Sequence, residues 1–224
     1  MRRLLWIGHL PSISANSIAA LQSRGVDIVH VEYWEQISEF SISSNEVRSA
    51  LFSGIPEDLF DSLVFSSNPS YACRPTANDE FCEFLEGEWQ ASLHSYMGLS
   101  KIRVINRRAL QFSASHGYSG TAFAGRLAKL GWKFSSLNHE AGVDQYILLK
   151  HWKIFGEENT IRQLREGHQE LLRVTWKYLG EIGCDYMFLG VNRSAELSLR
   201  ISEVSILPPK GLNDSLIEEL MHDL

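Results

Sequence analysis

Several features are scarce in this chain of 224 residues, and each scarcity excludes a class of protein. Its three cysteines are an odd number without CxxC spacing, which argues against a disulfide framework and against a zinc knuckle. No run reaches the roughly 18 apolar residues of a membrane span. The 27 acidic residues outnumber the 21 basic ones, so the net charge of −6 gives no overall attraction to nucleic acid or anionic lipid. We therefore expect a cytoplasmic protein with reduced thiols, without nucleic-acid or membrane partners.

The usual signatures of nucleotide, zinc and serine-nucleophile sites are missing as well. The first glycine loop lacks the GxGxxG fingerprint, the eight histidines form no HExxH or HxH pair, and there is no GxSxG elbow. His9 is nevertheless a candidate binding residue, because it follows the first predicted strand at an edge where α/β folds gather ligands. The alternative is a loop histidine that bonds a backbone carbonyl.

What is present is an ordinary globular composition with a clear alternation of strands and helices in its first part. Residues 4–8 form an apolar run that ends in glycine, a helix follows Ser12 or Ser14, and residues 26–31 form a second apolar run. This strand–helix–strand order predicts a βαβ unit with parallel pairing. We expect a third parallel strand over residues 61–66, and short helical turns around 46–52 and 56–60.

The second half of the chain has a different pattern. Two strands are predicted over 146–150 and 152–155, and the longest helix over 160–182. A hairpin over 186–191 and 197–204 and a short helix from 212 to 224 complete the chain. We expect an N-terminal α/β domain over 1–107 and a smaller α+β domain with antiparallel strands over 108–224.

Three segments make this order of elements similar to the ATP-grasp family, especially its amino-acid and peptide ligases. They are the start, with RLLWIGHL and RGVDIVHV, the junction KIRVINRRALQFSASHGYSGTAFAGRLAKLGWKF, and the closing segment LLRVTWKYLGEIGCDYMFLGVNRSAELSLRISEVSILPP. The resemblance implies a leading domain like that of the family and an ATP-grasp-like domain behind it. It also implies a lysine-bearing middle subdomain with a Gly-rich flap. Only Lys133 to Ile147 are available for that subdomain here, so we expect most of the nucleotide lid to be lacking.

The resemblance also implies a magnesium site of two carboxylates and an asparagine in the closing segment. Glu203 stands at the position of the family's glutamate, but Ser205 replaces the asparagine. The other acid would fall at about Leu189 or Gly190, where the chain has none. Glu203 is therefore either the one remaining metal ligand or an ordinary strand carboxylate, because Mg²⁺ requires several hard oxygen ligands.

The sequence leaves two interpretations open for each of four basic residues. Lys150 and Lys153 are either remnants of lysines that hold a nucleotide or solvated lysines at a strand edge. Arg107 and Arg108 belong to a basic cluster that either binds an acidic ligand or partner, because planar guanidinium groups suit carboxylate or phosphate, or balances the acidic segment 79–88.

Two functional hypotheses follow, one of a binding protein and one of an enzyme. In the first, the chain is a degenerate ATP-grasp-like protein that hydrolyses no ATP and needs no cofactor. It binds a peptide or amino-acid intermediate, or assists a full-length ligase, or forms a homodimer. In the second, it is an active ATP-dependent carboxylate–amine ligase that uses ATP and Mg²⁺. There Lys150, Lys153 and Glu203 hold nucleotide and metal, and the two arginines hold the substrate. A third reading, a flavodoxin-like module, requires the C-terminal strands to join the first sheet.

Overall fold

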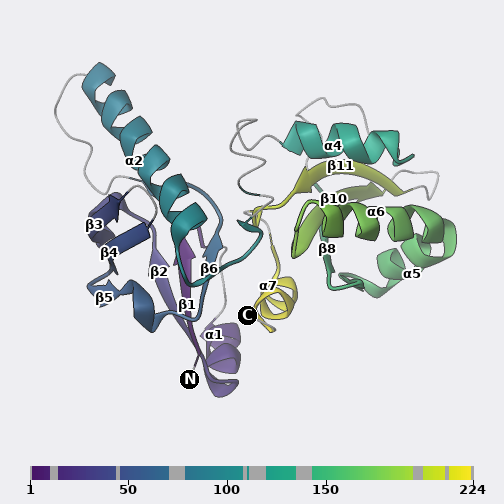
Figure 1. The fold of residues 1–224 in the computed structure, drawn as a ribbon. Helices are drawn as coiled ribbons and strands as arrows, with labels where there is room; N and C mark the ends of the chain where they lie inside the picture. The colour runs from purple at the N-terminus through teal and green to yellow at the C-terminus, as the bar shows by residue number, and fades with distance from the viewer. Residues whose placement is uncertain are drawn as a thin grey trace. The chain divides into compact units, whose positions relative to one another are not determined.

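The computed structural model describes residues 2–10, 15–43, 46–70, 79–107, 110, 120–134, 143–193, 199–209 and 212–222. The chain divides into two compact units (Figure 1). The first comprises residues 1–10 and 14–107 together with Leu224, and the second comprises residues 11–13 and 108–223. Among the described helices, none is long and apolar enough to cross a membrane.

The first unit is built on a parallel sheet with the strand order β2-β1-β6-β7. Its strands are β1 (Arg2–Ile7), β2 (Val26–Val31), β6 (Ser62–Phe65) and β7 (Arg103–Val104). The apolar run of β1 is buried from Leu4 to Ile7, as expected of a strand covered on both faces. Helix α1 (Ala15–Ser23) connects β1 to β2, which pair in parallel, so the predicted βαβ unit and the α/β class are confirmed.

A second, antiparallel sheet in this unit corrects the prediction for residues 38–58. It contains β3 (Ile37–Ser43), β4 (Glu46–Phe52) and β5 (Ile55–Pro56), so the helical turn predicted over 46–52 is wrong. The chain forms a strand there because Ala50 and Phe52 both point inward at a spacing of two, and Phe52 packs against Phe60 and Tyr96. A 3₁₀ turn, η2 (Glu57–Leu59), does form within the second predicted stretch, and helix α2 (Asp79–Leu99) packs on β3 and β4.

The second unit contains the predicted antiparallel strands in a sheet of their own, with the order β11-β10-β8-β9. The strands are β8 (Gln145–Lys150), β9 (Lys153–Phe155), β10 (Tyr186–Arg193) and β11 (Leu199–Ser205). Helix α4 (Gly120–Lys129) lies on β11, and helix α7 (Asp214–Met221) contacts β8 (Figure 1). The flavodoxin-like reading is wrong, because these strands do not join the first sheet.

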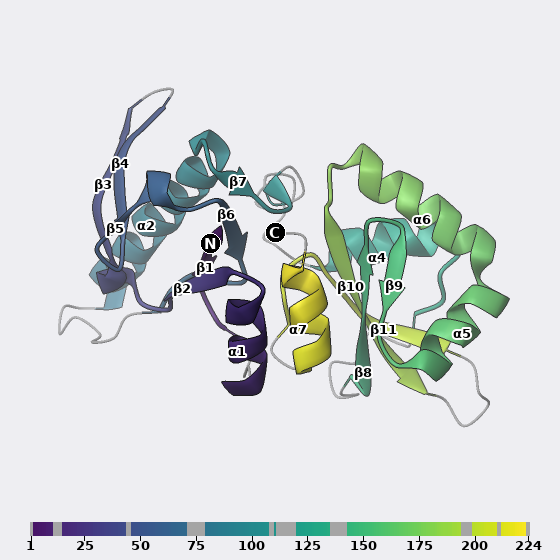
Figure 2. The same cartoon turned by 90° about the horizontal axis from the view of Figure 1, so that it is seen from below.

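The helix predicted over 160–182 is two helices. They are α5 (Glu158–Gly167) and α6 (Gln169–Glu181), drawn as separate ribbons in Figure 2. The chain leaves helical geometry at His168, whose φ is −139°. Gly167 precedes this break, and glycine weakens a helix interior because it loses most conformational entropy there. The ring of His168 stacks on Trp132 at a centroid distance of 5.5 Å, which holds the break in place.

Candidate functional site at the C-terminal hairpin

Three residues from neighbouring strands define the site that the sequence singled out. Gly190 on β10 pairs with Glu203 on β11 on one side and with Tyr146 on β8 on the other. Residues directly opposite one another in antiparallel strands lie on the same face of the sheet. The tyrosine and the glutamate therefore flank the glycine on one face, and their side chains can meet across it.

They do meet, in a hydrogen bond. The Tyr146 hydroxyl donates to Glu203 Oε2 at 2.9 Å. Partial burial raises the pKa of Tyr146, and the hydrogen bond to Glu203 and the charge of that carboxylate raise it further. The phenol therefore stays neutral at ordinary pH and acts as a donor. The glutamate that the resemblance assigned to a metal has a tyrosine as its partner in this structure.

No side chain fits at Gly190 without displacement of its neighbours. A Cβ built there would lie 2.9 Å from Val143 Cγ2 and 3.0 Å from Glu203 Cβ, distances shorter than ordinary van der Waals contact. An acid at Gly190 would therefore have to displace Val143 or the backbone. The missing carboxylate is thus a feature of the packing as well as of the sequence.

The hydroxyl of Ser205 is also engaged locally. Its Oγ donates to the Leu207 carbonyl at 2.6 Å and accepts from the Leu207 amide at 3.0 Å. Within the part of the chain that the structure describes, no three His, Cys, Asp or Glu side chains are grouped closely enough to hold a metal ion. One carboxylate and one engaged hydroxyl do not fit the octahedral oxygen set of Mg²⁺.

Lys150 lies elsewhere in the second unit and has a structural partner. Its side chain is 2% exposed, and Nζ donates to the carbonyls of Glu219 and Leu220 at 2.7 and 2.9 Å. These carbonyls belong to the last turn of α7, where carbonyls lack helical partners and the helix dipole favours a cation. Lys150 is therefore not the solvated strand-edge lysine of the second reading.

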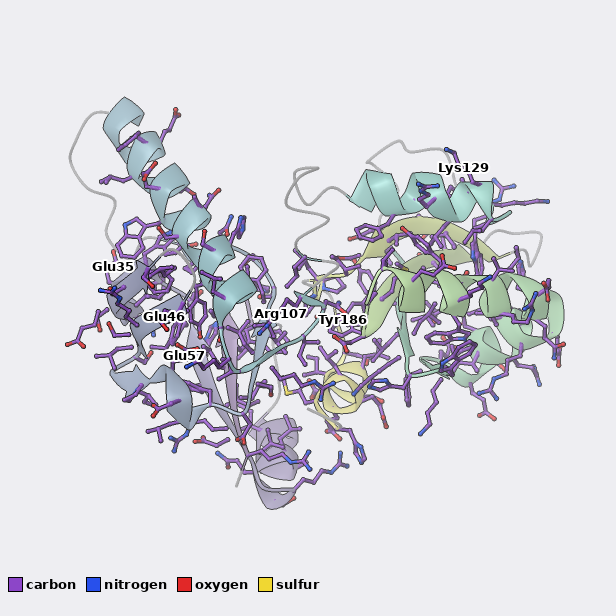
Figure 3. The ribbon with its side chains drawn as sticks, in the orientation of Figure 1. Glu35, Glu46, Glu57, Arg107, Lys129 and Tyr186 are labelled. Atoms are coloured by element: carbon purple, nitrogen blue, oxygen red, sulfur yellow. The ribbon has the colours of Figure 1, made fainter. Side chains whose placement is uncertain are left out.

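Lys153 and the arginines are placed differently. Lys153 pairs with Lys150 in the register of β8 and β9, but its side chain is exposed. Arg107, labelled in Figure 3, is half-buried in the first unit, where its Nη2 donates to the carbonyls of Ser100 and Ile102 at 2.7 and 2.6 Å. These bonds anchor the guanidinium just after α2. Arg108 lies outside the described residues.

His9 stands where the sequence predicted, just beyond β1 at the carboxyl edge of the parallel sheet. Its amide donates to Ser67 Oγ, and its carbonyl accepts from Trp6 Nε1 at 3.0 Å. Gly8 has a φ of +95°, and a Cβ there would lie 2.1 Å from the Ser67 carbonyl. Only glycine permits this approach, which packs the backbone of the first loop directly against the residues that follow β6.

Sequence reasoning missed the tyrosine of the hairpin site. Nothing in the local sequence around Tyr146 marks it, because it contacts Glu203 across 57 positions of the chain. The signal that would have found it is the register of three strands, which aligns Tyr146, Gly190 and Glu203.

Among the comparisons with known proteins, the one with solved structures identifies the fold. No protein-family model matches the chain, and no curated protein matches it. Among solved structures it is similar to a RiPP-associated ATP-grasp ligase of Chryseobacterium gregarium, in complex with ADP and a leader and core peptide. The TM-score is 0.63 at 10% identity, over 100% of this chain and 96% of that one.

Two further structures match at comparable length. The ATP-grasp ligase PsnB complexed with a minimal precursor has a TM-score of 0.57 at 10% identity, over 99% of each chain. The macrocyclase MdnC of Microcystis aeruginosa, bound with the precursor peptide MdnA, has a TM-score of 0.53 at 9% identity, over 99% of this chain and 100% of that one. The chain therefore has an ATP-grasp-like fold.

Proposed function

We propose that this protein is a degenerate ATP-grasp-like protein that binds a peptide and hydrolyses no ATP, acting as a binding or accessory subunit for a peptide or amino-acid ligase. The observation that carries the proposal is the packing at Gly190. Of the two positions where the resemblance implies an acid, Leu189 and Gly190, the second accepts no Cβ unless Val143 or Glu203 shifts, and the neighbouring Glu203 already accepts a hydrogen bond from Tyr146.

Electrostatics supports the loss of phosphoryl transfer. That reaction relies on positioning of the reactants and on metal ions and cations that stabilise charge on the transferred group. Of the residues that the resemblance implies for this task, Lys150 is bonded to the end of α7 and Glu203 is the one carboxylate. Among the described residues, the hairpin site offers a triphosphate with its magnesium one carboxylate, Glu203, and one locally bonded hydroxyl, Ser205.

The neighbours by fold support the peptide part of the proposal. Three ATP-grasp structures similar to this chain were solved with a leader, core or precursor peptide bound. In this proposal the chain keeps peptide binding and has lost the nucleotide chemistry. The accessory role then follows, since a peptide bound without activation needs a complete ligase to modify it.

Calorimetric titration of the purified chain with Mg-ATP tests the catalytic part. We expect no binding heat at millimolar nucleotide and no phosphate release in the presence of peptide. ATP turnover that Glu203→Gln abolishes would overturn the proposal in favour of an active carboxylate–amine ligase with a reduced site. The Gln variant keeps the shape of the side chain and removes its charge, so it serves as the matched control.

Equilibrium dialysis tests the binding part. A fluorescein-labelled pool of short peptides of mixed sequence should be enriched on the protein side, and the enriched fraction should be unchanged by Mg-ATP. Retention of no peptide, together with no effect of added amino acids on thermal stability, would contradict the binding role.

A further inference from the structure

A groove runs between two helices of the second unit, apart from the residues of the hairpin site. It encloses about 490 Å³ between α4 and α6, a volume typical of ligand clefts. Its lining residues recur every three or four positions on each helix, which places them along one stripe per helix. They are Arg126 and Lys129 on α4 with Leu130 just after it, and Val174, Lys177, Tyr178 and Glu181 on α6 with Ile182 just after it.

The two helices are held together at one end by a buried contact. The indole of Trp132, just after α4, donates from Nε1 to Thr175 Oγ1 on α6 at 2.8 Å, and both side chains are buried. Gly131 fits closely against Leu171, since a Cβ there would lie 3.0 Å from Leu171 Cδ2. The walls of the groove are therefore set by packing and do not depend on a ligand.

The charge of the groove is opposite to that of the whole chain. Arg126, Lys129 and Lys177 contribute three positive charges and Glu181 one negative charge, whereas the chain carries −6. Lys129 is labelled on α4 in Figure 3. Among the described residues, none of these three cations has a side-chain hydrogen bond or an ion pair. Burial raises the pKa of Tyr178, and the nearby charge of Arg126 opposes this rise in part.

We propose that the α4–α6 groove binds an acidic peptide segment, with carboxylates on Arg126, Lys129 and Lys177 and an apolar side chain on the floor formed by Leu130, Val174 and Ile182. This inference rests on the proposed function, and it adds where the peptide binds and that the peptide is acidic. Charge complementarity selects an acidic occupant, because three cations and the one carboxylate of Glu181 leave the cleft with a net positive charge.

A peptide fits this groove better than nucleic acid does. Cationic side chains on both walls with an apolar floor match a chain that alternates carboxylates with aliphatic side chains. Nucleic acid would meet three cations here and the field of a protein with net charge −6 elsewhere.

Fluorescence anisotropy of the full chain with a fluorescein-labelled peptide of repeating Glu-Leu-Gly units tests the assignment. We expect binding that weakens as salt rises, and much weaker binding of the Gln-Leu-Gly analogue. Lys177→Glu should weaken binding about tenfold, since it replaces an attraction by a repulsion at the groove. Lys101→Glu makes the same change of charge on an exposed residue of the first unit and should leave the affinity unchanged.

Glu181→Gln provides a variant that should gain affinity. It removes the one carboxylate of the groove, so we expect the acidic peptide to bind about threefold more tightly. Misfolding cannot produce this result, because a damaged groove loses affinity.

Four results would overturn the inference. The first is no binding of the acidic peptide. The second is equal weakening of binding by Lys177→Glu and Lys101→Glu, because the net charge of the protein alone would then explain the attraction. The third is a self-associated protein that Lys177→Glu converts to monomers, since the occupant would then be a second copy. The fourth is binding of the acidic peptide that no groove variant changes, which would leave the proposed function intact. ATP turnover that Glu203→Gln abolishes would instead contradict the proposed function and would not bear on peptide binding in the groove.

Discussion

The hairpin site and the α4–α6 groove belong to the same unit, yet their charged groups are in opposite situations. Glu203 accepts a hydrogen bond from Tyr146, and Lys150 on the same sheet is bonded to two carbonyls. The groove cations Lys129 and Lys177 have no such partner among the described residues. Charges that already have partners within the chain stabilise the fold, and charges without them are available to a ligand.

The largest expected effect contrasts a bonded lysine with a groove lysine. Lys150→Ala leaves two helix-end carbonyls without their donor and opens a cavity, so we expect a loss of about 3 kcal/mol in the free energy of unfolding. Lys177→Ala should change it by less than about 0.5 kcal/mol, because its exposed ammonium has no hydrogen bond or ion pair to lose among the described residues. Denaturant unfolding of both variants makes the measurement. Equal losses would remove the distinction between the two kinds of lysine.

A smaller loss is expected when the missing acid is put back. Gly190→Asp forces a side chain against Val143 and adds a negative charge beside Glu203, so we expect about 2 kcal/mol of destabilisation. Gly190→Ala separates the steric part from the charge. The thermal unfolding of both variants is measured with and without Mg²⁺. Strong stabilisation of the Gly190→Asp protein by Mg²⁺ would show that the site accepts a metal.

A still smaller effect is expected at the tyrosine, and it depends on pH. Tyr146→Phe removes one partly exposed hydrogen bond and should cost below about 1 kcal/mol at neutral pH. The folded protein raises the pKa of Tyr146 above the ordinary value of about 10, so the unfolded chain ionises first. The stability that this tyrosine contributes is therefore complete below pH 10 and is lost as pH rises further.

Unfolding curves between neutral and alkaline pH test this sign. The stability of the wild type should fall more steeply above pH 10 than that of Tyr146→Phe, so the two curves converge. Tyr96 and Tyr186 also have raised pKa values in the fold and contribute to the fall in both proteins. Curves that diverge would contradict the raised pKa of Tyr146.

The smallest effect is expected at a paired cation on the same helix as Lys177. Arg173 bonds Glu170 on α6 through an exposed ion pair and does not line the groove. Exposed pairs of this kind add little stability. Arg173→Ala should therefore leave both thermal stability and the affinity for the acidic peptide within error. A loss of affinity like the one expected of Lys177→Glu would extend the binding surface beyond the groove.

Strand positions were largely predictable, and helix breaks and the second small sheet were not. Apolar runs such as Leu4–Ile7 fill buried strands, so their period and length identify them. The strand over Glu46–Phe52 escaped because its pattern is irregular and its pairing with β3 decides its conformation. The break at His168 escaped because α5 and α6 together carry one continuous apolar stripe.

The candidate site divides in the same way. The absence of an acid at Gly190 and of an asparagine at Ser205 can be read directly from the residues, whereas the role of Lys150 cannot. A lysine at the end of an apolar strand is equally compatible with solvent, a nucleotide or a buried helix end. The carbonyls that bind it are 69 and 70 positions away in the chain, so only the docking of α7 selects among these outcomes.

The sequence alone was enough to predict the alternation of strands and helices and the parallel and antiparallel halves. These depend on residue type and on periodicity, which are local. Tertiary structure alone decided that Tyr146 faces Glu203, that Val143 fills the space beside Gly190, and that Arg126 and Lys129 line the same groove as Lys177 and Glu181. The register of strands and the packing of helices bring such residues together, and neither is written in any single segment of the chain.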